Sequence, residues 1–184
     1  MEHPAEVLRS DQVELRRWRG QDLEILHQLI IESRDHLLPW MSFAARHDRE
    51  QEEAFLARCE EEWASGQAYH YAITTDGVAV GSVSLMRRLG PGGLEIGYWL
   101  HHAWTGKGLT TMAAAALVQA GRRMDGIDHI EIHHDEANLA SGAVARRLGF
   151  TEVERVPTPE GPAAPSETGI DVIWRLETCP SRSA

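Results

Sequence analysis

The sequence has 184 residues, 42% of them hydrophobic and 25% charged, a size and composition typical of one globular domain. Acidic residues outnumber basic residues 28 to 18, which gives a formal net charge of -10. This balance argues against nucleic-acid binding, because a protein needs a basic face to displace the counterions of DNA or RNA. It suits attraction of a cationic amine, although solubility alone also explains it.

The sequence also predicts the compartment. It contains no apolar run of about 18 residues that could cross a membrane, and residues 1–6 lack the basic start and apolar stretch of a signal peptide. Cys59 and Cys179 form neither a disulfide framework nor a metal-ligand spacing. We therefore expect a cytoplasmic protein with no membrane or nucleic-acid partner.

The hydrophobic pattern predicts a mixed α/β fold of the α+β type, with about seven strands and four helices. The expected elements in chain order are a strand over 12–18, a helix beginning at the cap Asp22, a loop over 33–48, a helix over 48–64, strands over 69–75, 78–87 and 94–101, a helix over 109–124, a strand over 129–135, a helix over 139–148, and strands over 150–156 and 170–177. The order lacks the regular strand–helix alternation of a dinucleotide-binding sheet. We expect residues 1–177 to form a single domain and residues 178–184 a disordered tail.

The fourth expected strand leads into a glycine-bearing turn. One face of this strand carries Leu94, Ile96, Tyr98 and Leu100, and the other carries Glu95, Gly97, Trp99 and His101. The turn is Thr105-Gly106-Lys107-Gly108-Leu109-Thr110, and it precedes a helix whose first N–H groups lack helical partners and carry partial positive charge. Because glycine has no Cβ, Gly106 and Gly108 would let an anion approach the backbone closely. The turn alone is consistent with a phosphate site or with a plain connection between strand and helix.

Two other phosphate loops are excluded at this turn. The ATP-binding loop needs a glycine where this chain has His101, and a serine or threonine where it has Gly108. The dinucleotide fingerprint needs a third glycine where Thr111 stands. The context of the turn must therefore decide its ligand.

Four motifs supply that context, and they occur in a fixed order along the chain. They are Leu94-Glu95-Ile96-Gly97-Tyr98-Trp99-Leu100, Trp104-Thr105-Gly106-Lys107-Gly108-Leu109, Asn138-x-x-Ser141 and Arg147-Leu148-Gly149-Phe150. Together they resemble the GNAT acetyltransferases, and most closely the RimJ/RimL branch, which acetylates N-terminal amines of ribosomal proteins. The likeness covers about residues 10–177 and implies a GNAT fold, whose sheet splays between its fourth and fifth strands.

The resemblance implies acetyl-CoA as the cosubstrate and no metal. Its pantetheine would pair with the backbone of Tyr98, Trp99 and Leu100, and Asn138 would contact the same arm. The residues expected around the pyrophosphate are Gly106, Lys107, Gly108, Leu109, Thr110 and Thr111. The family's motif begins with Gln or Arg and ends with Gly or Ala, where this chain has Thr105 and Thr110, so a long polar anchor is lost. The acyl group stays open, since succinyl-CoA would use the same turn.

The chemistry needs a neutral amine and a proton for the departing thiolate. An α-amine with a pKa of about 8 is roughly a tenth neutral at pH 7, so it needs only a modest base, directly or through a water. Many members of the superfamily place a tyrosine acid on the last helix, where this chain has Ala145. The resemblance to the RimL type implies instead that Ser141 is the acid and Glu160 the base. Glu95 is the alternative base, or a residue that is structural or orients the substrate.

Two further groups bear on the acceptor side. His129, Glu131 and His133 share one face of the fifth expected strand, as zinc ligands could, but no further ligand is placed to complete a metal site. His133 could take the proton of the amine or be a structural histidine. The loop that contains Trp40 and Met41 is the expected wall of the acceptor site, as a lid or as a packed plug.

These features predict an N-acetyltransferase that acts on a primary amine, namely the N-terminal α-amine of a protein or peptide. A small-molecule amine (an antibiotic, a polyamine or a metabolite) is the first alternative acceptor. A non-catalytic acyl-CoA sensor is the second alternative, because Thr105 and Thr110 are altered and the tyrosine acid is absent. A homodimer is compatible with this branch, although no apolar stripe in the sequence demands one.

Overall fold

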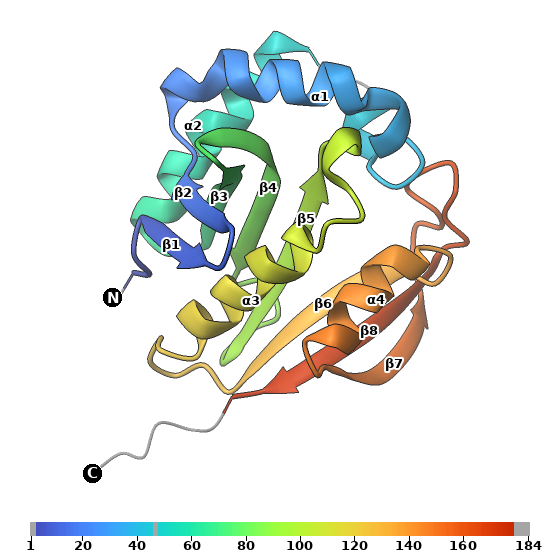
Figure 1. Ribbon diagram of the computed structural model, residues 1–184. Helices are drawn as coiled ribbons and strands as arrows, with labels where there is room; N and C mark the ends of the chain where they lie inside the picture. Colours follow the sequence, from blue (N-terminus) through green and yellow to red (C-terminus); the bar gives the residue numbers. More distant parts are fainter. Residues whose placement is uncertain (1–2, 46–47, 179–184) are drawn as a thin grey trace.

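A computed structural model describes residues 3–45 and 48–178, and it shows one mixed sheet with helices on both faces (Figure 1). The strands are β1 (Val7–Ser10), β2 (Val13–Arg17), β3 (Ala68–Thr75), β4 (Val78–Met86), β5 (Gly93–Leu100), β6 (His129–Asp135), β7 (Thr151–Pro157) and β8 (Ile170–Glu177). The helices are α1 (Leu23–Leu37), α2 (Arg49–Ser65), α3 (Leu109–Gly121) and α4 (Leu139–Arg147), with short 3-10 helices η1 (Gly20–Asp22), η2 (Ser42–Ala45) and η3 (His102–Trp104). The sheet order is β1-β2-β3-β4-β5-β6-β8-β7. Every neighbouring pair is antiparallel except β5 and β6, so the predicted fold class is confirmed.

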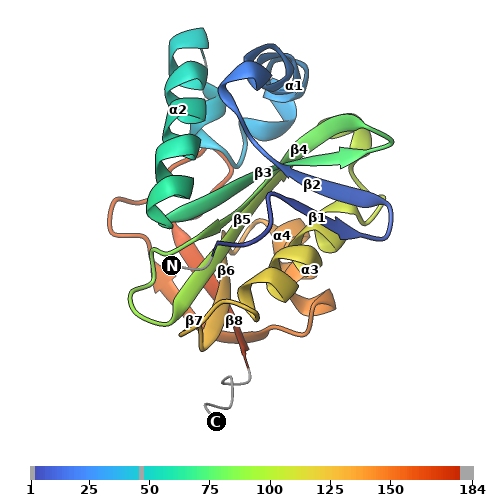
Figure 2. The same cartoon turned by 90° about the vertical axis from the view of Figure 1, so that its left-hand side faces the viewer.

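The helices form two layers around the first half of the sheet. Helix α1 packs on β4 and α2 packs on β3, while α3 lies across β1, β2, β4 and β5 on the opposite face (Figure 2). Helix α4 lies beside α3 and packs on β6. Because both faces of β3 are covered, all of its residues are buried.

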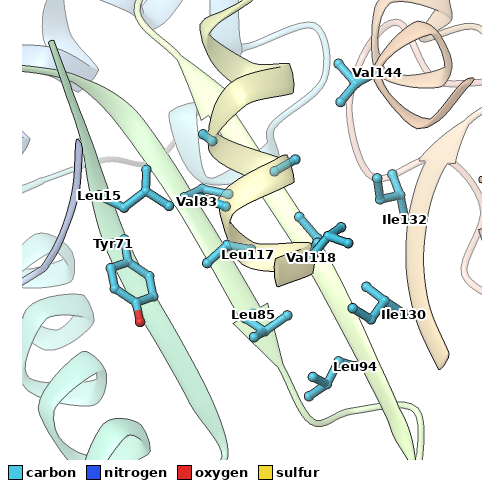
Figure 3. Packing of buried hydrophobic residues seen from close by; sticks show 14 of the residues in the cluster. Leu15, Tyr71, Val83, Leu85, Leu94, Leu117, Val118, Ile130, Ile132 and Val144 are labelled. Atoms are coloured by element: carbon cyan, nitrogen blue, oxygen red, sulfur yellow. The ribbon is translucent and has the colours of Figure 1, made fainter. Parts of the chain in front are cut away.

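The main core lies between α3 and the sheet (Figure 3). Leu117 of α3 is fully buried among apolar side chains that include Leu15 from β2 and Val83 and Leu85 from β4. Ala113 and Ala114 are also fully buried on this helix, because small side chains let it approach the strands closely. This packing fixes the start of α3 relative to the end of β5.

The sheet splits between β5 and β6. These strands pair only at Gly93 with His129, Leu94 with Ile130, and Glu95 with Glu131. From Ile96 onward β5 pairs with β4 alone, while β6 continues against β8 as far as Asp135. The splay that the family resemblance implies is therefore present, and it opens immediately after the two paired glutamates.

The structure corrects three sequence predictions. The sheet has an eighth strand, β1, which the pattern did not reveal because its residues are exposed or half-buried and the turn to β2 is formed by Asp11 at a φ of 49°. Residues 33–37 were predicted as loop, but they continue α1, since Ser33 and Leu37 lie on the same buried face as Leu26 and Ile30. Helix α3 ends at Gly121 rather than at Met124.

The ends of the chain are described only in part. Thr178 falls in the predicted tail, yet it is buried, and its hydroxyl donates to the carbonyl of Ile127 at 2.6 Å. Residues 179–184 of that tail lie outside the described residues. Among the helices of the described ranges, none is both long and apolar enough to cross a membrane.

Candidate active site

A cavity of about 500 Å³ occupies the gap between β5 and β6. Its lining comes from both faces of the sheet, since Glu95 and Tyr98 point to opposite sides of β5 and both border it. A continuous sheet could not hold such a cavity, so the splay creates it. The residues that line it are Trp40, Met41, Phe43, Phe55, His70, Ser82, Ser84, Met86, Arg88, Glu95, Ile96, Gly97, Tyr98, Trp99, His133, His134, Asp135, Asn138, Ser141, Glu167 and Asp171.

On the face covered by α3 and α4, the cavity has a neutral wall made of Tyr98, Asn138 and Ser141. The Tyr98 hydroxyl lies 2.9 Å from Ser141 Oγ and donates to the Ser141 carbonyl at 3.2 Å. Burial raises the pKa of Tyr98 to about 12, so its proton stays on at neutral pH. Asn138 caps α4 by accepting from the Ser141 N–H at 3.2 Å. Ser141 is therefore held at the gap with a hydrogen-bonded phenol beside it.

On the opposite face lies a charged wall, in which Arg88, Glu95 and His133 line the cavity. Glu131 contacts His133 from outside the lining, and Arg175 in turn contacts Glu131. Arg88 Nε donates to Glu95 Oε2 at 2.6 Å, and its second guanidinium nitrogen contacts Glu95 Oε1. Arg175 binds Glu131 through Nε at 2.7 Å and a terminal nitrogen at 2.6 Å. Each carboxylate is buried, with 5% of its side chain exposed, and each has its own arginine.

His133 lies between these two carboxylates. Its Nε2 is 2.6 Å from Glu131 Oε2, and its Nδ1 is 3.9 Å from Glu95 Oε2. Burial raises the pKa of Glu131, but the hydrogen bonds from His133 and Arg175 outweigh it and leave the pKa below its ordinary value. An ionised Glu131 holds the proton on Nε2 of His133, so a neutral His133 presents Nδ1 as an acceptor toward the cavity.

Two loops close one side of the cavity, and they are joined to each other. The turn after α1 brings Trp40 and Met41 to the lining, and the Ser166 N–H from the β7–β8 loop donates to the Pro39 carbonyl at 3.0 Å. Glu160 lies on the same β7–β8 loop, but it is exposed and is not among the lining residues. Glu167 reaches the cavity instead, and its Oε2 accepts from Ala163 and Ala164 at 2.6 and 3.0 Å.

Asp135, at the end of β6, anchors this loop. Its buried carboxylate accepts the backbone N–H groups of Ala137, Thr168 and Gly169 at 2.8 to 2.9 Å and that of Ile170 at 3.4 Å. Burial raises the pKa of Asp135, but these four backbone donors outweigh it and lower the pKa overall. The ionised form of Asp135 therefore fixes where the β7–β8 loop leaves the sheet.

The turn between η3 and α3 has the geometry of an anion site. Gly106 and Gly108 have φ of 75° and 76°, and Gly108 is the N-cap of α3. The N–H groups of Leu109, Thr110 and Thr111 precede the first helical hydrogen bond, from Met112 N to Gly108 O at 3.0 Å. Nothing would meet a Cβ on Gly106 within 4 Å, so the space over the turn is open.

The side chains of Thr105 and Lys107 are held by residues of η3. The Thr105 hydroxyl donates to the His102 carbonyl at 2.9 Å, and the Lys107 ammonium lies 4.3 Å from the centre of the Trp104 ring. No residue of 105–111 lines the cavity between β5 and β6. The turn and the cavity are thus two separate parts, joined along the chain by the end of β5.

The structure brings eight of the predicted site residues into one cavity, whereas Leu100 and the turn residues 105–111 do not line it. Glu95, Tyr98, Trp99, His133, Asn138, Ser141, Trp40 and Met41 all line one cavity, whereas Glu160 does not. The sequence missed Arg88, Glu167 and Arg175, which carry no motif. Of the zinc-like pattern, Glu131 and His133 belong to the charged wall, whereas His129 Nδ1 contacts Asp128. Within residues 3–45 and 48–178, no cluster of three or more His, Cys, Asp or Glu side chains could hold a metal ion.

Comparisons with known proteins agree with this geometry. YdaF of Bacillus subtilis (strain 168), provisionally assigned as a ribosomal N-acetyltransferase, is 26% identical over 150 residues, which are 78% of this chain and 80% of YdaF. RimL, the ribosomal L7/L12 α-N-protein acetyltransferase, solved with coenzyme A, superimposes with a TM-score of 0.85 at 23% identity, covering 94% of this chain and 98% of RimL. The microcin C7 self-immunity acetyltransferase MccE, solved with acetyl-CoA and AMP, gives 0.82 at 22% identity over 91% and 93% of the two chains.

At these identities the structural likeness establishes the fold, and the sequence pattern of a family establishes membership. The pattern of the acetyltransferase (GNAT) domain matches residues 12–151, from β2 to the start of β7. That range contains β5, the glycine turn, Asn138 and Ser141. The chain belongs to the GNAT acetyltransferase family.

Proposed function

We propose that this acetyl-CoA-dependent acetyltransferase acetylates a primary amine, and that the amine is the N-terminal α-amine of a protein or peptide. The observation that carries the proposal is the cavity between β5 and β6, with a neutral wall on one face of the sheet and a charged wall on the other. An acyl donor and a cationic acceptor could enter from opposite faces and meet in the gap. The names of RimL and YdaF, which describe N-acetyltransferases of ribosomal proteins, support this choice of acceptor.

The glycine turn fits the pyrophosphate of acetyl-CoA. Three N–H groups at the start of α3, the helix dipole and the open space over Gly106 would hold a doubly charged anion. The backbone of Tyr98, Trp99 and Leu100 lies on the side of β5 that has lost β6 as a partner, so it is available to the pantetheine amides. Bound acetyl-CoA supplies the activated thioester, and the protein positions it and moves protons.

Ser141 is the proposed acid. Its hydroxyl proton passes to the departing thiolate as the carbon–sulfur bond breaks. The Tyr98 hydroxyl, 2.9 Å away, can then return a proton to the serine oxygen. Because the pKa of Tyr98 is about 12, this phenol remains a donor throughout the neutral range. Together, Tyr98 on β5 and Ser141 on α4 would supply the proton that many members of the superfamily take from a tyrosine at the position of Ala145.

His133 is the proposed base, with Glu95 orienting the amine. Both oxygens of Glu95 already accept from Arg88, so this carboxylate is better suited to hold an ammonium than to remove its proton. The Nδ1 of His133 faces Glu95 Oε2 across 3.9 Å and can accept the proton lost as the amine attacks the thioester carbon. Glu160 would need a movement of the β7–β8 loop to act here, and Glu167 lies nearer.

The proposal is tested by incubating the protein with acetyl-CoA and two sets of acceptors. One set contains short peptides with free N-termini and the other contains free small amines, and acetylation is followed by mass spectrometry and thiol release. We expect turnover of peptides, and none of the same peptides with blocked N-termini. Turnover of free small amines alone would replace the protein acceptor by the small-molecule alternative. Tight acetyl-CoA binding without turnover of either set would favour the sensor.

Location and assembly complete the proposal. A cytoplasmic enzyme fits an acceptor that is a ribosomal protein, as named for RimL. A homodimer stays open as an assembly, and sedimentation of the purified chain with and without CoA would determine it.

A further inference from the structure

A second cavity lies next to the active-site cavity, and the proposed function does not use it. It measures about 420 Å³ and is enclosed by α1, η2, α2 and the side chain of Trp99. Its lining residues are Leu26, Ile30, Phe43, Gln51, Glu52, Ala54, Phe55, Arg58 and Trp99. Phe43, Phe55 and Trp99 border both cavities, so these three aromatic residues form the boundary between them.

One residue of this lining is unusual for so apolar a site. Glu52, in the first turns of α2, is 3% exposed. Its Oε2 lies 2.8 Å from His27 Nδ1, but its Oε1 is buried and has no hydrogen-bond partner among residues 3–45 and 48–178. A buried carboxylate oxygen without a donor is costly, and in native proteins it calls for a missing partner.

The surroundings favour a cation as that partner. The aromatic faces of Phe43, Phe55 and Trp99 attract ammonium and guanidinium groups, and the tilted pair Phe43–Trp99 has ring centres 6.1 Å apart. Leu26 and Ile30 supply an apolar floor for a hydrocarbon stem. Arg58 is the one cationic side chain among the described lining residues. It is directed to the rim, since its side chain is 56% exposed and lies over Phe55 near Glu62.

We propose that this cavity is a specificity pocket for the acceptor, which binds a side chain with an apolar stem and a terminal ammonium or guanidinium group that pairs with Glu52. The inference rests on the proposed function, because it names the kind of peptide that the enzyme prefers. The α-amine enters the active-site cavity, and a lysine or arginine side chain of the same peptide passes the aromatic boundary. Since Oε1 is shielded from solvent, the Glu52 carboxylate rotates to meet the incoming cation.

Peptides that differ by one charge test this directly. Lysine and norleucine have nearly the same stem, and only lysine carries the ammonium, so each is placed in turn at the first three positions of a short peptide. With the wild type we expect kcat/KM for lysine to exceed that for norleucine roughly 10-fold or more at one position. Equal values at all three positions would overturn the inference while leaving the proposed function intact.

Two matched variants locate the effect. Glu52→Gln keeps the shape and the contact with His27 but removes the charge, so it should reduce the lysine preference to within about threefold. Glu53→Gln removes the same charge from the exposed neighbouring position and should preserve the preference. If Glu52→Gln kept the full preference for lysine, the lysine side chain would bind outside this cavity and the inference would be wrong. Phe43→Leu, at a side chain 39% exposed, is the second variant should Glu52→Gln fail to fold, and it should lower the preference about threefold.

A binding measurement separates this inference from the reaction itself. The Nα-acetylated lysine and norleucine peptides need no turnover, and isothermal titration calorimetry gives their affinities for the complex with CoA. Tighter binding of the acetyl-lysine peptide, lost in Glu52→Gln, supports the pocket even if no acceptor is turned over. Equal affinities would refute the pocket whatever the fate of the acetyltransferase proposal.

Discussion

The two walls of the gap between β5 and β6 use different chemistry. The neutral wall has hydroxyl and amide groups from β5 and α4, and its polar contacts are hydrogen bonds between uncharged groups. The charged wall has two carboxylates, two arginines and a histidine on β5, β6, β8 and the turn after β4. In the proposed reaction, the departing thiolate would meet a proton donor on the first wall, and the arriving ammonium would meet the Glu95 carboxylate on the second. The difference shows that one splay in a sheet can place an uncharged wall and a charged wall on opposite faces of a single gap.

The largest expected effect is on the neutral wall. Ser141→Ala removes the proposed proton donor, so kcat should fall about 100-fold while the Kd for acetyl-CoA changes less than about twofold. Steady-state kinetics and calorimetry measure the two quantities. Ser65→Ala, at an exposed serine of α2, is the control and should match the wild type. If the Ser141→Ala enzyme had a normal kcat, Ser141 would not be the acid, and Tyr98 or a water would supply the proton.

On the charged wall we expect a somewhat smaller effect with a different signature. His133→Gln preserves a polar side chain but cannot take a proton, so kcat/KM should fall about 30-fold. The acidic limb of the pH–rate profile should flatten in the variant, because the proposed base is absent. An unchanged limb would assign the base to another group, with Glu167 the next to test.

A substitution in the glycine turn tests whether acetyl-CoA binds there, outside the two walls of the cavity. Gly108→Ala adds a Cβ at a φ of 76°, which strains the N-cap of α3 and crowds the anion site, so KM for acetyl-CoA should rise about 10-fold with little change in kcat. Gly126→Ala is a matched control, because Gly126 has a φ of 73° and a Cβ added there would meet no atom within 4 Å. If both variants raise KM equally, the effect is general strain and not loss of the phosphate cradle.

The smallest effect on kcat should come from a change at Asp135, which supports the β7–β8 loop. Asp135→Asn weakens the acceptor for four backbone N–H groups, so the protein should lose about 1 kcal/mol of unfolding free energy at pH 7 and keep kcat within about twofold. The folded pKa of Asp135 is below its ordinary value of 3.8, so its stabilisation is complete above that value and is lost as the pH falls through the folded pKa. Thermal unfolding between pH 7 and pH 3 should show a shallower acid loss in the variant. An identical pH dependence would assign acid sensitivity to other carboxylates.

Much of the fold follows from local patterns. The alternation along residues 94–100 separated the two faces of β5, and Leu94, Ile96 and Leu100 of the apolar face are in the core. The end of α1 was missed because Pro39 interrupts the pattern, although Leu37 continues the buried stripe before it. Strand β1 was missed because an exposed edge strand needs no apolar face.

The site is harder to read from the sequence, because its contacts join distant positions. Arg175 lies 44 residues beyond Glu131, and only the β6–β8 register brings them together. The parallel pairing of Glu95 with Glu131 likewise has no local signal. Glu160 and Glu167 share a loop rich in proline and glycine, and which of them reaches the cavity depends on Asp135, more than 20 residues away in the sequence.

The short pairing of β5 with β6 has a consequence for molecular recognition. Beyond Glu95, β5 has an unpaired edge within the molecule, and such an edge is usually a hazard because another chain can extend the sheet. Here α4 and the β7–β8 loop flank the edge, so a folded protein strand cannot reach it, whereas a slender ligand with amide groups can. Amide hydrogen exchange along Ile96–Leu100 should therefore slow when CoA binds, as it does when a peptide completes an open sheet.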